Sequence, residues 1–245
     1  MEVKKFYNSQ ASKWFSNHPR TISDLIGRPA IYNLCKKYGK NKTFLDLGCG
    51  EGYFSRKLSN FSKKVVGIDI SEEMINLANK NKTPKEEYHC LDMKHLNIGQ
   101  PKFDIAISIF SLNYLRTTKE LSLVFKNVNK SLKKDGKFIF LVPHPLGSLI
   151  NEKSKWYIHP KFEFNYSKDE GRFFKYKNKR INNKDFLEVG FYFHRLETYS
   201  RLLNKNGLII KQILEPYPND KISQKYDTRI EEEIPYYLII EAIKC

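Results

Sequence analysis

Several classes of protein are excluded by what this sequence lacks. It contains no run of about 18 apolar residues that could cross a bilayer, and Met1 leads into polar sequence without the apolar segment of a secretion signal. The four cysteines are widely spaced, and no Cys-x-x-Cys pair or histidine cluster accompanies Cys35, Cys49, Cys90 and Cys245. We therefore expect a cytoplasmic protein with reduced, mostly buried thiols and no metal site built on them.

Acidic side chains are scarce relative to basic ones. The 27 Asp and Glu residues face 43 Lys and Arg residues, which gives a net charge of +16 and a surface that attracts anions. Nucleic acid, phosphate and carboxylate are all candidate partners. Many lysines stand beside asparagine, as in the run from Asn79 to Lys82, and biased codon usage alone produces such runs. The charge is therefore either functional or compositional.

Length and composition indicate one large globular domain. The chain has 245 residues, of which 40% are hydrophobic and 29% charged, so disorder, collagen and coiled coil are all excluded. At roughly 100–200 residues per domain, we expect a single domain over residues 1–245 that carries an insertion. The chain is expected to be a monomer or a homodimer.

Short β-branched and aromatic runs alternate with helical stretches, which is typical of βαβ units and a mostly parallel sheet. Seven strands are predicted, at Thr43–Leu47, Val65–Ile70, Glu87–Leu91, Phe103–Phe110, Lys137–Val142, Leu208–Leu214 and Tyr236–Ile243. Four helices are predicted between them, at Tyr53–Asn60, Ser71–Lys80, Thr118–Lys133 and His194–Lys205.

Two segments stand outside this alternation. Residues 1–40 form a predicted helical cap, and residues 145–193 form a predicted insertion between core segments 41–144 and 194–245. Within the insertion, Asn151–Lys184 carries ten basic and four acidic side chains interleaved with eight aromatic rings. We expect this segment to fold over a substrate as a lid.

A glycine-rich turn follows the first predicted strand. Leu45 to Gly52 reads Leu-Asp-Leu-Gly-Cys-Gly-Glu-Gly, so the chain turns tightly and approaches any ligand closely. The dinucleotide fingerprint needs its third glycine one residue later, where Tyr53 stands. Asp46 places a carboxylate where a pyrophosphate would be repelled and a cationic ligand attracted.

Two further acids fall in register with this turn. Asp69 ends the second strand, the position from which a carboxylate accepts hydrogen bonds from both ribose hydroxyls. Asp92 follows the third strand, beside Met93. Asp69, Asp92, Ser108 and His144 all fall at one edge of the predicted sheet.

With these three motifs the chain resembles the class I S-adenosylmethionine-dependent methyltransferases. The resemblance implies a Rossmann-like, three-layer α/β/α sandwich with a seven-stranded, mostly parallel sheet of order 3-2-1-4-5-7-6 and an antiparallel last strand. It implies that Gly48, Gly50 and Gly52 hold the methionine end of the cofactor, Asp69 the ribose and Asp92 the adenine amine. S-adenosylhomocysteine would be the product.

Other candidate cofactor residues have structural alternatives. Asp46 either contacts the ligand or caps its own turn, and Met74 either stacks under adenine or packs in the core. Tyr7 resembles the aromatic residue with which many relatives close over the cofactor. Ile70, Met93 and Ser108 complete the predicted set, and Cys49 is assigned to packing.

The methyl acceptor is less well defined. Strand four ends without the Asn/Asp-Pro-Pro-aromatic tetrapeptide of enzymes that methylate nucleobase amines, and no acids follow strands four and five to hold Mg²⁺. We therefore predict a metal-independent reaction. Methyl transfer is an in-line displacement that needs positioning, and a base when the acceptor is a hydroxyl.

Further motifs resemble a bacterial subgroup whose members act on small or unknown molecules. The His-Pro pair at His144 resembles its fifth strand, and the His-Arg-Leu-Glu-Thr-Tyr segment at His194 and the Glu-Pro-x-Pro segment at Glu215 resemble its tail. His144 either acts as a base or shapes its loop, and Arg195 either binds an acid or caps a helix. His194 is a second catalytic candidate, and Tyr114, Tyr192, Arg195 and Tyr217 are the substrate-binding candidates.

Three functions compete. The first is O- or N-methylation of a small, planar or acidic metabolite beneath the basic aromatic lid. The second is tRNA or rRNA methylation, because rings stack on bases while Lys and Arg neutralise phosphates. The third is a non-catalytic S-adenosylmethionine-binding protein. We expect no membrane partner.

Overall fold

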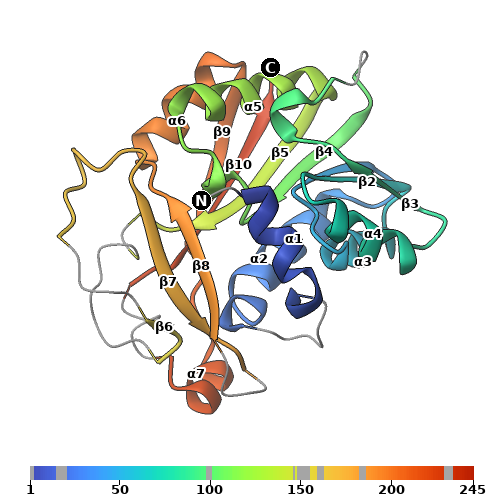
Figure 1. The fold of residues 1–245 in the computed structure, drawn as a ribbon. Coiled ribbons are helices and arrows are strands. Elements are labelled where there is room, and N and C mark those ends of the chain that lie inside the picture. Colours follow the sequence, from blue (N-terminus) through green and yellow to red (C-terminus); the bar gives the residue numbers. More distant parts are fainter. Residues whose placement is uncertain are drawn as a thin grey trace.

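A seven-stranded sheet forms the centre of the molecule (Figure 1). The computed structural model describes residues 3–14, 21–97, 101–145, 147, 155–158, 163–181, 186–228 and 234–245. The strand order is β3-β2-β1-β4-β5-β10-β9, and β10 runs antiparallel to both of its neighbours while the other pairs are parallel. Counted within this sheet, β9 and β10 are its sixth and seventh strands, so the predicted order and the antiparallel last strand are confirmed.

The strand bounds follow the sequence-based prediction closely. The strands are β1 (Thr43–Leu47), β2 (Lys64–Asp69), β3 (Glu86–Cys90), β4 (Phe103–Ile109), β5 (Leu132–Pro143), β9 (Leu208–Leu214) and β10 (Tyr237–Lys244). Only β5 differs by more than a residue or two, because it begins at Leu132 rather than Lys137. Asp135 inside it has a φ of 59°, so the Asp135-Gly136 pair is a local irregularity within the strand.

Helices cover both faces of this sheet. The helices are α1 (Val3–Trp14), α2 (Gly27–Tyr38), α3 (Tyr53–Ser59), α4 (Glu72–Lys80), α5 (Thr118–Ser131), α6 (Leu196–Lys205) and α7 (Asp220–Tyr226). Three short 3-10 turns add η1 (Ile22–Asp24), η2 (Met93–His95) and η3 (Leu112–Tyr114). The four predicted helices are present, and Ser71 caps α4 by accepting a hydrogen bond from the Met74 amide at 3.2 Å.

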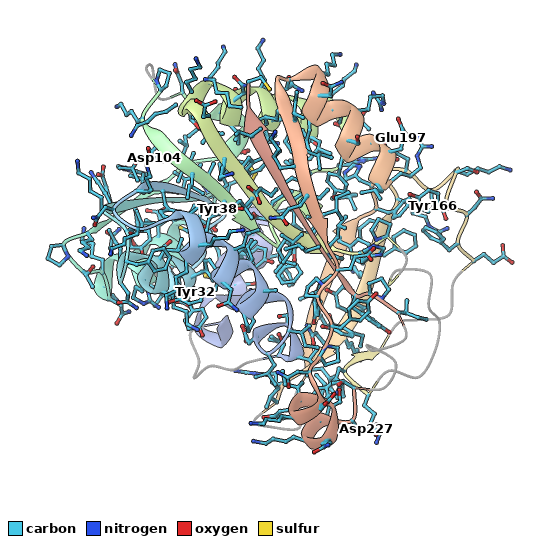
Figure 2. The ribbon with its side chains drawn as sticks, turned by 180° about the vertical axis from the view of Figure 1, so that it is seen from behind. Tyr32, Tyr38, Asp104, Tyr166, Glu197 and Asp227 are labelled. Carbon is cyan, nitrogen blue, oxygen red and sulfur yellow. The ribbon has the colours of Figure 1, made fainter. Side chains whose placement is uncertain are left out.

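Two hydrophobic clusters hold the layers together. One joins α5 and α6 to the sheet, and the other joins α2 and α3 to the opposite face. Figure 2 views the molecule from behind, with Tyr32 and Tyr38 marking α2. In the first cluster, the fully buried rings of Phe125, Phe138 and Phe140 lie with their centroids 5.0 to 6.0 Å apart. Burying each such ring contributes about 1.5–3 kcal/mol, which fixes the sheet as a rigid platform. None of the helices in the described ranges is long and apolar enough to cross a membrane.

The insertion contains a second, three-stranded antiparallel sheet, which we call the inserted sheet. It consists of β6 (Tyr157–Ile158), β7 (Phe173–Lys179) and β8 (Phe186–Tyr192), in the order β6-β7-β8. The hairpin β7-β8 extends away from the central sheet (Figure 1). These strands were not predicted. Several charged or aromatic residues counted in the insertion, Glu152, Lys153, Lys161, Phe162 and Lys184, lie outside the described residues.

A buried cluster around Glu170 fastens the inserted sheet to the core. His194 is 3% exposed, and its Nδ1 lies 2.7 Å from Glu170 Oε1 while its Nε2 lies 2.8 Å from the Leu115 carbonyl oxygen. Arg195 Nε and Thr198 Oγ1 donate to Glu170 Oε2 at 2.9 and 3.0 Å. This Glu170 cluster therefore joins the loop before β7, the start of α6 and the segment after β4.

The Glu170 cluster predicts an acid-sensitive stability. Burial alone raises the pKa of the Glu170 carboxyl, but the bonds from His194 and Arg195 lower it to about 2. A depressed pKa stabilises the fold above the unfolded value of about 4.3, and this contribution is lost as the pH falls towards 2. We expect Glu170→Gln to lower the free energy of unfolding by about 2 kcal/mol at pH 7, with a smaller difference from the wild type at pH 3, measured by urea denaturation.

Glu197→Gln is the matched control. Glu197, labelled in Figure 2, forms ion pairs with Arg195 and Arg201, but its side chain is 55% exposed. We expect a change below about 0.5 kcal/mol, because exposed ion pairs contribute little. Equal losses in the two variants at pH 7 would contradict the assignment of Glu170 as the anchor.

Candidate functional site

A cavity of about 270 Å³ lies at the carboxyl ends of the central strands. Residues of the turn after β1, the ends of β2 and β4, η3, and the start of β10 line it, together with α1 and the inserted sheet. Figure 1 shows α1 at this edge of the sheet, between α4 and the hairpin β7-β8. In open α/β sheets, this edge is where ligands bind, at the point where the strand order changes direction.

The turn after β1 depends on its glycines. Gly48, Gly50 and Gly52 have φ values of 74°, 54° and 79°, in the left-handed region that other residues enter at a cost. A Cβ on Gly48 would lie 2.3 Å from the Cβ of Ser111, whereas one on Gly50 would meet no atom within 4 Å. Gly48 therefore packs against the segment after β4, and Gly50 leaves a bare stretch of backbone facing the cavity.

Asp69 ties this turn to the second strand. Its Oδ2 accepts a hydrogen bond from the Gly50 amide and its Oδ1 from the Ser71 amide, both at 2.9 Å. Burial raises the pKa of the Asp69 carboxyl, and the bonds from these amides oppose that effect. The carboxylate is thus fixed in orientation at the cavity wall, with lone pairs left over for a ligand.

Asp46 lies below the glycine turn at the end of β1. It is 2% exposed, and Ser55 Oγ donates a 2.6 Å hydrogen bond to its Oδ2. Burial raises the pKa of Asp46 to about 7, because the charged form loses its hydration. A cationic ligand in the cavity would favour the charged form. Asp46 therefore both fixes the start of α3 and contributes negative potential to the site.

The opposite end of the cavity carries Asp92 and several apolar side chains. Asp92 caps η2 by accepting a 2.9 Å bond from the Lys94 amide, and Lys94 Nζ lies 3.6 Å from Asp92 and 3.1 Å from Glu120. Ile70, Met74 and Met93 line the wall nearby. Met74 is 2% exposed, so it also packs in the fold.

Helix α1 covers the cavity through two side-chain contacts. Tyr7 donates a 2.6 Å hydrogen bond from its hydroxyl to that of Tyr114, and Ser71 Oγ donates to Asn8 Oδ1 at 2.6 Å. Burial raises the pKa of the Tyr7 hydroxyl well above its usual value. Two of the four predicted tyrosines, Tyr7 and Tyr114, therefore meet at the wall of the same cavity.

His144 enters the cavity from the end of β5. It is 4% exposed, and its Nε2 lies 2.9 Å from Glu215 Oε1 in the segment after β9. Burial lowers the pKa of His144, while the negative charge of Glu215 raises it in part. The His-Pro and Glu-Pro-x-Pro motifs, distant in sequence, are thus joined by one hydrogen bond.

Six of the predicted site residues do not line the cavity. Gly52 starts α3 with its Cβ position filled by the Tyr88 hydroxyl, and Ser108 is fully buried, 2.5 Å from Ser111 Oγ. His194 has both ring nitrogens engaged in the Glu170 cluster, so neither is open to a substrate, and Arg195 pairs with Glu170 and Glu197.

Two predicted tyrosines lie elsewhere for packing reasons. Tyr192 packs on Phe173 across the hairpin with ring centroids 4.9 Å apart, and Tyr217 is 50% exposed. The catalytic candidate His194 and the substrate-binding candidates Arg195, Tyr192 and Tyr217 therefore do not lie among the residues that line this cavity. Of the catalytic and substrate candidates, the structure brings His144 and Tyr114 to the cavity.

Several lining residues were not predicted. Arg28 lies at the start of α2 with its guanidinium carbon 5.2 Å from the centre of the Phe110 ring. Phe110 has a φ of 53°, a strained value for a bulky residue and one typical of functional positions. Asn113 and Asn178 also line the cavity. Nothing in the local sequence marks these four residues.

The cysteines take no part in a metal or disulfide site within the described residues. All four are free, with Cys35 and Cys49 buried and Cys90 and Cys245 exposed, so the expectation of mostly buried thiols is right for two. Cys49 packs with Ile75, Ala78 and Tyr88, and burial raises the pKa of its thiol, which disfavours a thiolate. In the part of the chain that is described, no group of three His, Cys, Asp or Glu side chains could hold a metal ion.

Comparisons with known proteins point to one chemistry. A family profile described as a methyltransferase domain matches residues 45–140. A solved structure from Listeria monocytogenes, named as a candidate S-adenosylmethionine-dependent methyltransferase, is similar with a TM-score of 0.68 and 26% identity over 89% of this chain and 97% of that one.

Two curated relatives are also similar to this chain. An uncharacterised protein of Haemophilus influenzae is 26% identical, over 93% of this chain and 90% of its own length. A ubiquinone biosynthesis O-methyltransferase of Coxiella burnetii is 32% identical, over 49% of this chain and 48% of its own length.

Fold and comparisons together define the class. The chain is a class I S-adenosylmethionine-dependent methyltransferase, and its cofactor is S-adenosylmethionine. The cavity fits that cofactor, which carries sulfonium and ammonium cations and one carboxylate. The buried acids Asp46 and Asp69 offer negative potential, Arg28 offers one cation, and the open face of Gly50 leaves room for close approach.

The glycine geometry predicts two different outcomes for the same substitution. Gly50→Ala should cost about 1 kcal/mol of stability from its positive φ and weaken S-adenosylmethionine binding, because its methyl group enters the cavity. Gly48→Ala should cost about 3 kcal/mol or more, because its Cβ collides with Ser111 as well. Urea denaturation and calorimetric titration with S-adenosylmethionine measure both. Full cofactor affinity in a folded Gly50→Ala variant would contradict this view of the turn.

Proposed function

We propose that the protein transfers the methyl group of S-adenosylmethionine to an oxygen or nitrogen atom of a small metabolite, without a metal. The observation that carries this proposal is that one cavity is shared by the glycine turn and the inserted sheet. Tyr157, Tyr176 and Phe191 of the inserted sheet line the same space as Gly50 and Asp69. The inserted sheet would then act as the lid that excludes water from the acceptor.

We assign cofactor contacts from the geometry of this wall. The backbone of Gly48 and Gly50 would hold the methionine end, the oriented Asp69 carboxylate the ribose hydroxyls, and Asp92 the adenine amine. Ile70, Met74 and Met93 would pack on the adenine ring. Tyr7 would cover the cofactor from α1, and Arg28, beside Asp46, would pair with the methionine carboxylate.

The chain's own part in the reaction is positioning and handling of one proton. The bound cofactor supplies a methyl group on a sulfonium, which is open to in-line attack. The inserted sheet and α1 enclose the reacting atoms, so the acceptor meets the methyl group in a fixed orientation and away from water. His144 is proposed as the base that takes the acceptor's proton, and Glu215 as the residue that orients its ring.

Two other functions are alternatives to methylation of a small metabolite. RNA methylation is supported by the net charge of +16. Against it, the exposed lysines Lys175 and Lys177 of strand β7 do not line the cavity, whereas Tyr176 and Asn178, on the other face of the strand, do. A non-catalytic cofactor-binding protein is compatible with the glycine turn and Asp69. The name of the Coxiella relative suggests an oxygen acceptor, but that likeness spans about half of each chain. The cytoplasmic location stays a prediction.

Isotope transfer tests the proposed function. Protein incubated with methyl-labelled S-adenosylmethionine and a cell extract, split into RNA and small-metabolite fractions, should place the label in the small metabolites. Asp69→Asn should lose this transfer, whereas Asp104→Asn should keep it, because Asp104 binds Thr43 and Lys133 at the opposite end of β4 (Figure 2). Label in RNA would overturn the acceptor class, and bound cofactor with no transfer would favour the non-catalytic alternative.

If His144 is the base, the rate of methyl transfer should depend on pH. Because burial lowers its pKa below the ordinary 6.5, the acid limb of the rate profile should lie below pH 6.5, measured with the acceptor that labelling identifies. His144→Gln should lower kcat by about a hundredfold. Glu215→Gln removes the charge that raises this pKa, so the acid limb should move to lower pH.

A residue outside the cavity provides the control. His89 is exposed and pairs with Glu87, so His89→Gln should leave both kcat and the pH profile unchanged. A purely structural His144 would give a different pattern: lowered melting temperature, with an acid limb that stays in place when Glu215 is replaced.

A further inference from the structure

The two faces of strand β7 differ in chemistry. Side chains alternate along the strand, so Phe174, Tyr176 and Asn178 share one face, and Lys175 and Lys177 share the other. Tyr176 and Asn178 line the cavity, whereas both lysines are exposed to solvent. The positive charge of the described insertion therefore faces outward, and the surface it presents to the cavity is neutral.

The rest of this wall is aromatic and uncharged. Tyr157 stacks on Tyr236 with ring centroids 4.8 Å apart and an interplanar angle of 17°, and Phe110 lies edge-on to Tyr237 at 6.0 Å. The lining residues that β6, β7, β8 and the start of β10 contribute are Tyr157, Tyr176, Asn178, Val189, Phe191, Tyr236 and Tyr237. None of these carries a charge. Flat rings of this kind form a slot that suits another ring.

Most polar groups around this slot are already satisfied. The hydroxyls of Tyr157 and Tyr237 bond to each other, and Thr21 Oγ1 lies 2.8 Å from Ser23 Oγ. Two amide oxygens differ. Asn178 and Asn113 are only 8% and 4% exposed, and the Oδ1 atom of each is buried without a hydrogen-bond partner among the described residues.

An unpaired buried acceptor is costly, so its presence needs a reason. Both orphan oxygens belong to residues that line the cavity, and both are hydrogen-bond acceptors. A ligand that supplies a hydroxyl or amino hydrogen would satisfy them. A ligand that supplies only acceptor atoms, such as a carboxylate or phosphate, would leave them unpaired.

We propose that the cavity beneath the inserted sheet recognises an uncharged aromatic methyl acceptor whose hydroxyl or amino group donates a hydrogen bond to Asn178 Oδ1. Asn113 Oδ1 receives a second donor from the same compound or its substituent. This inference rests on the proposed function and narrows its acceptor to neutral phenols and aromatic amines. It departs from the expectation of an acidic acceptor, because the lysines that suggested an acid point away from the cavity.

Three small probes test the proposal by calorimetric titration at saturating S-adenosylhomocysteine. Methyl 4-hydroxybenzoate is a neutral donor, methyl 4-methoxybenzoate lacks the donor, and 4-hydroxybenzoate carries a negative charge. We expect the first to bind at least about tenfold more tightly than each of the others, the gain of one buried hydrogen bond. In Asn178→Leu the two esters should bind within about threefold of each other.

Stability provides an independent readout for Asn178. Leucine is similar in size and removes an unpaired buried amide, so Asn178→Leu should melt at the same temperature as the wild type or higher. Lys177→Gln, one residue away on the outer face, should change neither the melting temperature nor the affinity for any probe.

The outcomes separate this inference from the proposed function. If 4-hydroxybenzoate bound most tightly and Arg28→Gln removed that preference, the acceptor would be an anionic compound and the inference of a neutral acceptor would be overturned. Equal binding of both esters to the wild type, no binding of any probe at millimolar concentration, or a lowered melting temperature in Asn178→Leu would also overturn it. Failure of the wild type to bind S-adenosylhomocysteine at all would instead overturn the proposed function.

Discussion

The hydrogen bond from the Gly50 amide to Asp69 connects the features on which the site depends. It joins the turn after β1 to the end of β2, and Gly48, Gly50 and Gly52 in that turn all adopt left-handed backbone angles. The same bond orients the Asp69 carboxylate, whose second oxygen is held by the Ser71 amide at the start of α4. The turn, the acid and the beginnings of α3 and α4 are therefore one connected unit.

The other half of the cavity is built from segments far apart in the sequence. The inserted sheet contributes aromatic residues, α1 contributes Tyr7, and the end of β5 contributes His144. The Glu170 cluster holds the inserted sheet in register with the segment after β4, since His194 bridges Glu170 and the Leu115 carbonyl. The Glu170 cluster thus holds in place the inserted sheet, three of whose aromatic residues line the cavity.

Local patterns were sufficient to predict the central sheet and several residues that line the cavity. Alternation of strands and helices, the glycine spacing and the acids after β2 and β3 are all properties of short segments, and the predicted Asp46, Asp69 and Asp92 meet in one cavity. The alternation of aromatic and lysine residues over Phe173–Lys179 is a period-two signal that could have predicted β7.

The part of the cavity wall formed by α2, the segment after β4 and the inserted sheet could not be predicted, because its signals are not local. The His-Arg motif at His194 looked like site chemistry, yet Glu170, distant in the chain, occupies both residues. Arg28, Phe110 and Asn178 become neighbours of the cavity only through the packing of α2 and the inserted sheet. Asn178 in particular is an ordinary strand residue until burial leaves its amide oxygen unpaired.

The central claim is that this cavity holds S-adenosylmethionine with its ribose on Asp69 and its methyl group directed beneath the inserted sheet. A crystal structure of the protein with S-adenosylhomocysteine tests it most directly. We expect both ribose hydroxyls within hydrogen-bond distance of the Asp69 carboxylate, the methionine end over Gly50, and the sulfur facing the space bounded by His144 and Asn178. A cofactor bound with its sulfur turned away from that space, or without contact to Asp69, would contradict it.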